Sequence, residues 1–253
     1  MLEGDLLKRI HKARSLVAIG CVAAVVGGCA PPAFVSHRNI NQRAPLLKKI
    51  AVLPPRVDVF ELGAGGVLEK MDDWSRSGSD NVWNAFVDEL SRRQGVQVTR
   101  LDVASLSEDL KIELEQTQLL FDAVCASVVP HLYGIPAQRF EDKFSNFDYS
   151  LGAETAKLNV LDVDAFVLAR GIDQISSSGR QALQVASLLA AAALGGGIIV
   201  RGGGTAMNIA LVDARTGELL WYTSNRSDVT FDLRNPSSSA SFIANAMWGF
   251  PVQ

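Results

Sequence analysis

The chain has few of the residues that build metal centres or disulfide scaffolds, with three cysteines and three histidines among 253 residues. No paired-cysteine or paired-histidine spacing typical of a zinc site occurs. Cys125 lies among apolar neighbours, so we expect a buried small hydrophobe rather than a reactive thiol. His131 stands alone, and we expect it at the surface or at a helix end. These scarcities predict neither a bound metal nor a cofactor.

An excess of positive charge is also missing, because 24 Lys and Arg face 27 Asp and Glu. This balance gives no electrostatic case for nucleic-acid binding. The chain has no Gly-x-Ser-x-Gly nucleophile elbow and no phosphate-binding loop of the Walker type. Glu113 and Glu115 are two residues apart and do not share a helix face. We therefore expect a protein that is not an enzyme; an envelope hydrolase would need residues that converge from distant parts of the chain.

Residues 1–28 are typical of a lipoprotein signal peptide. Basic residues precede an uncharged apolar stretch over residues 15–26, and a glycine pair stands directly before Cys29. Small residues before a cysteine resemble the bacterial lipobox, in which the thiol accepts the lipid. We expect Cys29 to be acylated and to become the first residue of the mature chain. Cys21 is a weaker candidate, because the apolar stretch before it is short.

This signal gives the chain an expected cellular address. An uncleaved transmembrane anchor is the alternative, but the apolar stretch is shorter than the roughly 20 residues of a bilayer span. Two or three acyl chains on one cysteine hold a protein stably to a membrane. Ala30, rather than an aspartate, follows Cys29, which by resemblance to enterobacterial sorting favours the outer membrane. The signal does not choose a face of that membrane, and we expect the periplasmic one.

The rest of the chain is expected to form one α/β domain over residues 48–250, joined to the lipid by an aperiodic tether over residues 29–47. The run from Lys49 to Leu53, stopped by two prolines, predicts a strand buried on both faces. Periodicity and capping residues predict the remaining elements: strands at 96–99, 163–171, 207–211 and 219–223, a loop at 63–79, and helices beginning at Asp80, Ser105, Ala153 and Ser237.

The order of these elements predicts the topology. Strands separated by helices must lie parallel, whereas the turn at 213–218, with Gly217, closes an antiparallel hairpin. Asp213 can accept turn N–H groups, and Trp221 is expected in the core. The prediction is a three-layer α/β fold whose mixed β-sheet, with parallel core strands plus a C-terminal antiparallel hairpin, is flanked by helices.

Several of these segments resemble a known family. "KKIAVLPP" (48–55), "DVDAFVLARG" (162–171) and "TAMNIALVDARTGELLWYTS" (205–224) follow the lipobox. Together they resemble a group of bacterial outer-membrane lipoproteins related to the curli-secretion lipoprotein and to the amino-terminal domain of the Tol–Pal translocation protein. The resemblance covers roughly residues 48–247. Its motifs are structural, so it implies a fold more than a function.

An apolar Gly/Ala-rich insertion is expected at about 182–204. It is apolar at odd and even positions alike, so it lacks the alternation of channel-forming strands. Three interpretations stay open: a buried or half-buried helix, an exposed patch that docks on a membrane or another subunit, and a transmembrane span, which three successive glycines disfavour. For the second, the expected contact residues are Leu188, Leu189, Leu194, Ile198 and Ile199.

The sequence therefore favours a lipid-anchored cell-envelope lipoprotein. Its expected role is a non-enzymatic binding or assembly module of an outer-membrane or periplasmic complex for secretion, surface polymer or cell-wall synthesis. The expected partners are the membrane, through the N-terminal acyl chains, unidentified envelope proteins, and other copies of the chain in a homo-oligomer. The alternative is a subunit of an oligomeric outer-membrane secretion channel, in which the 182–204 region rearranges.

Overall fold

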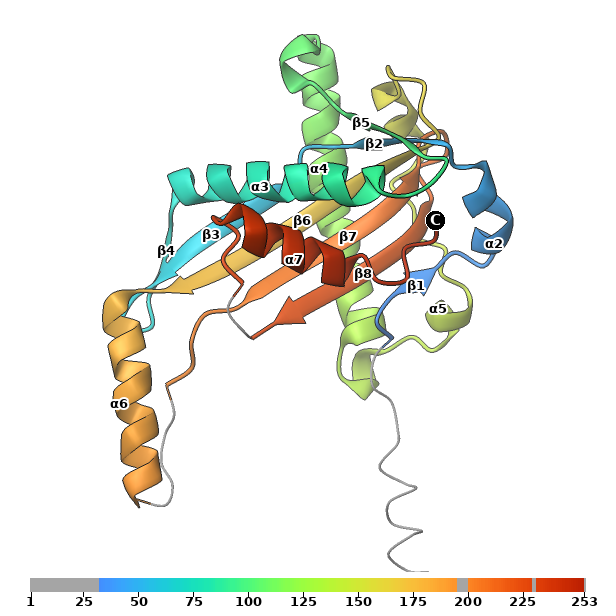
Figure 1. The fold of residues 1–253 in the computed structure, drawn as a ribbon. Helices are drawn as coiled ribbons and strands as arrows, with labels where there is room; N and C mark the ends of the chain where they lie inside the picture. Colours follow the sequence, from blue (N-terminus) through green and yellow to red (C-terminus); the bar gives the residue numbers. More distant parts are fainter. Residues whose placement is uncertain (1–31, 195–199, 229–230, 253) are drawn as a thin grey trace, which may run out of the picture. The chain divides into compact units, whose positions relative to one another are not determined.

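A mixed sheet organises the part of the chain that our computed structural model describes, residues 32–194, 200–228 and 231–252 (Figure 1). The strand order is β1-β8-β7-β6-β2-β5, while β3 pairs with β6 and β4 with β3. Pairing is parallel where β6 meets β2 and β3 and where β2 meets β5, and antiparallel elsewhere. The strands are β1 Val35–Ser36, β2 Lys49–Val52, β3 Arg56–Leu62, β4 Leu68–Lys70, β5 Gln97–Arg100, β6 Ala165–Ser176, β7 Thr205–Asp213 and β8 Leu219–Ser227.

Helices cover both faces of this sheet, which confirms the predicted three-layer fold (Figure 1). Buried side chains of α3 and α7 meet one face, and those of α4 meet the other. The α-helices are α2 Ile40–Arg43, α3 Asp72–Ser91, α4 Glu108–Val128, α5 Asp142–Ser145, α6 Ser178–Leu194 and α7 Pro236–Ala246. The shorter turns are η1 Ala44–Leu46, η2 Val103–Ser105, the π-helical η3 Val129–Tyr133, η4 Pro136–Gln138 and η5 Ala153–Leu158.

The central strand β6 has two successive parallel partners. Its first half pairs with β2 and its second half with β3. Pro54 and Pro55 separate β2 from β3, since proline has no N–H to donate to a ladder. Leu53, just before them, still donates its N–H to the carbonyl of Val167 at 3.0 Å. β2 and β3 therefore act as one parallel partner of β6, which is interrupted at the two prolines.

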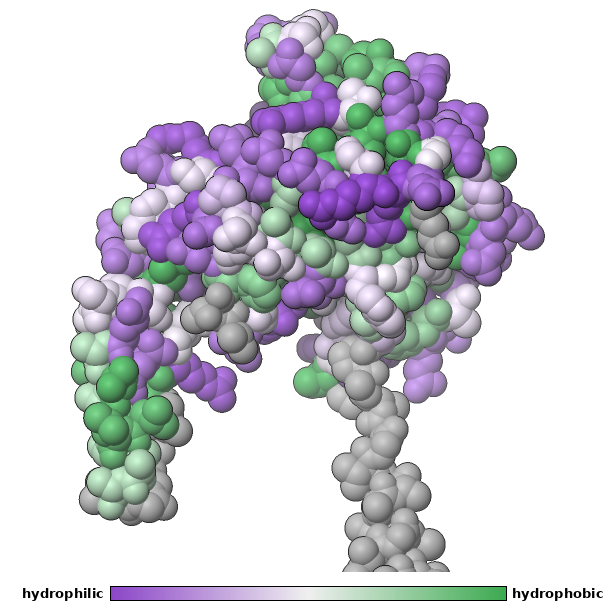
Figure 2. Space-filling view, in the orientation of Figure 1, coloured by the Kyte–Doolittle hydropathy of each residue, from purple (hydrophilic) through white to green (hydrophobic). Residues whose placement is uncertain are grey.

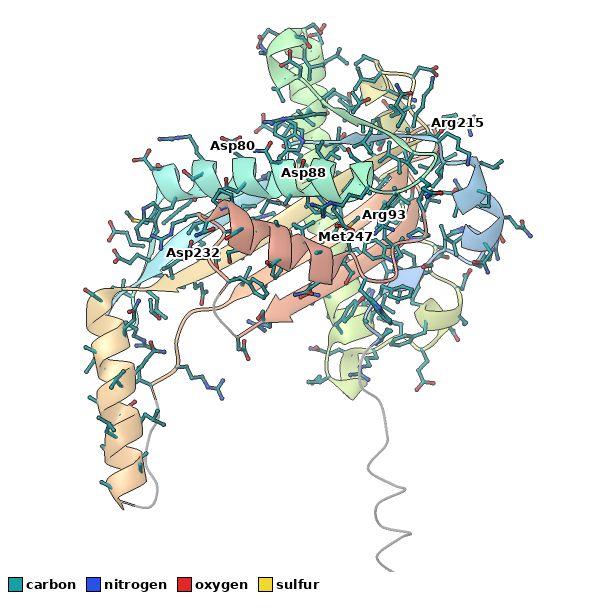
Figure 3. All side chains as sticks on the ribbon, viewed as in Figure 1. Asp80, Asp88, Arg93, Arg215, Asp232 and Met247 are labelled. Carbon is teal, nitrogen blue, oxygen red and sulfur yellow. The ribbon has the colours of Figure 1, made fainter. Side chains whose placement is uncertain are left out.

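The expected loop at 63–79 and the helix start at Asp80 are both wrong. The chain forms β4 and then begins α3 at Asp72, so that Asp80 lies within α3 (Figure 3). The small polar residues here face the sheet: Ser75 Oγ accepts from Val59 N at 2.9 Å, and Ser79 Oγ accepts from Val57 N at 3.2 Å. Such tertiary hydrogen bonds leave no periodic apolar signal in the sequence.

Residues 33–47 also differ from the expected tether. Val35 is buried, and the strand β1 that contains it pairs with β8. His37 N donates to the carbonyl of Leu220 at 2.9 Å, and Thr223 Oγ1 donates to the carbonyl of Ala33 at 2.8 Å. Residues 33–47 therefore belong to the compact unit Ala33–Gln253, because backbone pairing with an edge strand holds a segment that has no apolar periodicity of its own.

The C-terminal hairpin follows its prediction closely. β7 and β8 pair antiparallel, and Gly217 in their turn has φ +71°. Asp213 Oδ1 accepts from the N–H groups of Arg215 and Thr216 at 2.9 and 3.0 Å. Trp221 is fully buried, as expected. Capping predictions were displaced by a few residues, since Ser107 caps α4 and Asn235 caps α7.

Candidate functional site

The connection between β6 and β7 departs from the layered fold. β6 and β7 pair up to Asp173 and Thr205, and the chain between them forms α6 and returns over residues 200–204. We call the described residues on either side of the tip, 178–194 and 200–204, the apolar arm. In Figure 1, α6 leaves the end of β6 and points away from the sheet. Figure 2 shows hydrophobic side chains on the visible surface of α6.

The apolar arm is helical but not buried, so the expectation of a buried or half-buried helix is wrong. Leu183 and Val185 are 44% and 59% exposed, and Leu188 and Leu189 are 56% and 66% exposed. Among the described residues, α6 meets the sheet at its first turn and otherwise only the returning leg of the arm, so its leucines have no core to pack on.

The structure describes only some of the expected contact residues. Leu188 and Leu189 lie on α6 with their side chains exposed. Leu194 ends α6, and its side chain, together with Ile198 and Ile199, lies outside the described residues. Cys29 also lies outside them. The structure therefore brings together two of these residues on one exposed helix.

The base of the arm is fixed by polar contacts. Arg180 donates through Nε and Nη2 to the carbonyl of Arg201, at 3.0 and 2.8 Å, which ties α6 to the returning segment. Ser176 Oγ accepts from Gly203 N at 3.1 Å. These bonds hold the two legs of the arm together where they leave the sheet.

A buried carboxylate lies next to this base, where the ladder of β6 and β7 ends. Asp173 is fully buried and accepts hydrogen bonds from Thr205 Oγ1 at 2.7 Å and from Leu233 N at 2.9 Å. Burial raises the pKa of Asp173, against the lowering effect of these two bonds. Asp173 was not among the predicted site residues, although it is the single acidic residue of β6. Its bonds join β6, β7 and the segment before α7, which is a structural role.

A second group of charges surrounds the start of β3. Asp58 forms ion pairs with Lys70, at 2.7 Å, and with Arg170. Burial would raise the pKa of Asp58, but the hydrogen bonds and charges of Lys70 and Arg170 outweigh it and lower that pKa. Asp122 accepts from Arg56 at 2.9 Å on the same side. Every charge named here has an opposite partner, so this group holds β3, β6 and α4 together.

The carboxyl end of β5 carries an open depression of about 430 Å³. Its wall is Trp83, on which Arg100 stacks with its guanidinium carbon 3.7 Å from the ring centroid. Arg100 also donates to Asn84 Oδ1 at 3.0 Å. Ligands of open α/β sheets often bind at such strand ends. Here the guanidinium is already engaged by the ring and the amide, and the depression presents no nucleophile beside a base.

The structure also places Cys125 and His131, the two residues that the sequence offered for thiol or metal chemistry. Cys125 is buried, as expected, and this burial raises the pKa of its thiol to about 12. His131 Nδ1 lies 2.6 Å from Tyr149 Oη, beside the ring of Phe140. Within the described ranges, no cluster of three or more His, Cys, Asp or Glu side chains could hold a metal ion. Nor does any described helix combine the length and apolarity needed to cross a membrane.

Comparison with known proteins gives distant structural likenesses. No model of a known protein family matches the chain, and no curated protein matches it. A PelC dodecamer from Paraburkholderia phytofirmans is 11% identical, with TM-score 0.33 over 89% of this chain and 94% of that one. Lipoprotein GNA1162 from Neisseria meningitidis is 14% identical, with TM-score 0.33 over 79% and 95%. The LpoB C-terminal domain from Salmonella enterica is 10% identical, with TM-score 0.27 over 76% and 95%. Likenesses at this level assign neither a family nor an activity to the chain.

Proposed function

We propose that the chain is a lipid-anchored envelope lipoprotein that acts as a non-enzymatic binding or assembly module of an outer-membrane or periplasmic complex. The observation that carries this proposal is the glycine pair before Cys29, at the end of a basic and then apolar leader. Such a leader directs a chain out of the cytoplasm, and acylation at Cys29 then retains the chain at a membrane.

The short stretch of chain between Cys29 and the first residue bonded to the sheet supports the proposal. Ala33 is already hydrogen-bonded to Thr223, four residues after Cys29. Arg43 strengthens this start through ion pairs with Asp213 and Glu218, at 2.5 and 2.6 Å. A domain fastened so near its lipid stays at the bilayer surface, which raises its effective concentration toward membrane partners without any strong contact.

The charged groups support a binding role over a catalytic one. Asp58, Arg170 and Arg100 are engaged by opposite charges or by an aromatic ring. Catalysis needs groups whose pKa is shifted toward working pH beside a reacting atom, and such groups cluster in clefts. Partner recognition needs only an accessible surface held in a fixed place.

Mass analysis of the N-terminal peptide from native membranes tests the anchor. We expect a mature chain that begins at Cys29 with acyl chains on its sulfur and its new amino group. The Cys29→Ser variant should keep its leader and lose the modification. Cys21→Ser is the matched control and should be processed as the parent is. A parent chain with residues 1–28 attached, or with a free Cys29 thiol, would overturn the proposal.

The assembly role has a separate readout. After extraction in mild detergent, the native protein should migrate on native gels well above the mass of one mature, acylated chain. A detergent-extracted protein that stays monomeric after crosslinking in intact envelopes would refute the assembly role and leave the anchor standing.

A further inference from the structure

In the apolar arm, the distribution of polar and apolar side chains is the reverse of that in a helix on a water-soluble surface. Along α6, the half-buried positions include the polar residues Gln184 and Ser187, which lie beside Gly202 and Val200 of the other leg. Ser187 Oγ accepts from Val200 N at 3.0 Å. Between residues 182 and 193, every exposed position is leucine, alanine or valine. Polar groups inside and apolar groups outside are the pattern of a helix in lipid.

The charges of the arm lie only at its base. Residues 181–200 contain no Asp, Glu, Lys or Arg, and Arg180 and Arg201 flank this stretch. The side chain of Arg201 is exposed. Lipid headgroups offer phosphate oxygens at the depth where the hydrocarbon begins, and a guanidinium binds phosphate well there. The order of charges along the arm therefore matches a bilayer surface.

The length of α6 suits one leaflet. Its uncharged part, residues 181–194, measures about 21 Å at 1.5 Å per residue. The hydrocarbon core is about 30 Å thick, or about 15 Å per leaflet, so α6 is too short to cross it and fits within one leaflet when tilted from the bilayer normal. Insertion from one side requires that the chain come back to the same surface, and Val200, bonded to Ser187, begins the leg that returns to β7.

The arm also leaves the sheet on the side from which the chain comes to β1. β1 is antiparallel to β8, with Val35 beside Tyr222, so Ala33 lies nearer the end of β8. That end, Ser227, pairs with Thr205 at the base of the arm. Cys29 is four residues from Ala33, which limits their Cα separation to about 14 Å. The chain therefore enters β1 from the side of the sheet at which β8 ends and β7 begins.

We propose that the apolar arm inserts into the leaflet that carries the acyl chains, with α6 among the hydrocarbon tails and Arg201 at the phosphates. The idea rests on the proposed function for the position of the bilayer, and it adds a second, proteinaceous contact. A second copy is the competing occupant. A symmetric contact between two arms would bring four arginines together with no acidic residue of the arm between them. Repulsion among these like charges disfavours such a contact.

A depth measurement on the full, acylated protein tests the insertion. A nitroxide is attached at Leu188→Cys, and the protein is placed in vesicles of phosphatidylethanolamine and phosphatidylglycerol. Buried Cys125, with its pKa raised to about 12, stays unlabelled. Leu119→Cys is the matched control, because Leu119 is 50% exposed on α4, away from the arm. Ser178→Cys marks the base.

The expected result is a label at residue 188 that oxygen reaches and a water-soluble nickel complex does not. Its collision rate with nickel should fall about tenfold below that of Leu119→Cys, because hydrocarbon excludes charged solutes. A label at Ser178→Cys should lie between the two. Equal nickel access at residues 188 and 119 would overturn the proposal. So would dipolar broadening between labels at residue 188 that disappears on dilution with unlabelled protein, since it would assign the arm to a second copy.

The same sample distinguishes failure of the insertion from failure of the proposed lipid anchor. The mass of its N-terminal peptide reports acylation, independently of the label. A free thiol at Cys29 would overturn the proposed function, while the depth of residue 188 would still decide the fate of the arm.

Discussion

Helices α3 and α6 have similar lengths, 20 and 17 residues, and opposite relations between composition and surroundings. The first half of α3 is polar, yet Ser75 and Gly78 within it are buried against the sheet. α6 is rich in leucine and alanine, yet Leu188 and Leu189 are exposed. Hydrophobicity therefore indicates the environment that a segment requires, and that environment need not be the core of its own domain.

The reason for the difference lies in the surface that each helix meets. β4 pairs only with Phe60–Leu62, so the first half of β3 has an open edge. Ser75 and Ser79 accept hydrogen bonds from the N–H groups of that edge, and Gly78 lets α3 approach Val59 closely. α6 begins where the ladder of β6 and β7 has ended. In the described part of the chain, no strand continues the sheet there for α6 to pack on.

The largest expected effect contrasts a core residue of α3 with an exposed residue of α6. Phe86 is fully buried, so Phe86→Ala should lower the free energy of unfolding by about 3–5 kcal/mol. Leu188→Ala should change it by less than about 0.5 kcal/mol, because its side chain contacts mostly solvent. Urea unfolding of the detergent-purified protein measures both. A cost for Leu188→Ala near that of Phe86→Ala would break the contrast, since it would show that α6 packs on the domain.

Much of the fold was predictable because its signals are local. The run from Lys49 to Leu53 and the turn at Gly217 identify a buried strand and a hairpin from neighbouring residues alone. α3 was missed in its first half, because Ser75 and Ser79 act through a distant strand. The exposure of Leu188 was left open, since an apolar run looks the same whether protein or lipid covers it.

The next effect contrasts two serine hydroxyls that each hold a helix to a neighbouring segment. Ser75→Ala leaves the buried N–H of Val59 without its acceptor and should cost about 1–3 kcal/mol. Ser187→Ala removes the acceptor of Val200 N in the arm, where water can replace it, and should cost less than about 0.5 kcal/mol in detergent-free buffer or dilute micelles. Exposed Ser77→Ala is the control on α3. Equal costs for Ser75→Ala and Ser187→Ala would show that the arm is as dry as the core.

The smallest effect is the change in the free energy of unfolding with pH. It should have opposite signs for Asp58, beside α3, and for Asp173, at the base of the arm. The pKa of Asp58 is lowered, so its stabilisation is present above the unfolded value near 3.8 and is lost as pH falls toward the folded pKa. The pKa of Asp173 is raised, so the ionised form opposes folding at neutral pH, and stability is gained as pH falls from the raised pKa toward 3.8. A tenfold change in the proton affinity of a carboxylate on folding corresponds to about 1.4 kcal/mol.

Comparing Asp58→Asn with Asp173→Asn separates the two contributions. Between pH 7 and pH 3, the free energy of unfolding of the parent minus that of Asp58→Asn should decrease, because the parent loses its ion pairs with Lys70 and Arg170. Over the same range, the parent minus Asp173→Asn should increase, because the variant has no carboxyl group to protonate. Thermal unfolding at each pH gives both differences. Slopes of the same sign would mean that Asp173 is held by charge, as Asp58 is, and that the base of the arm is not the dry junction that its burial indicates.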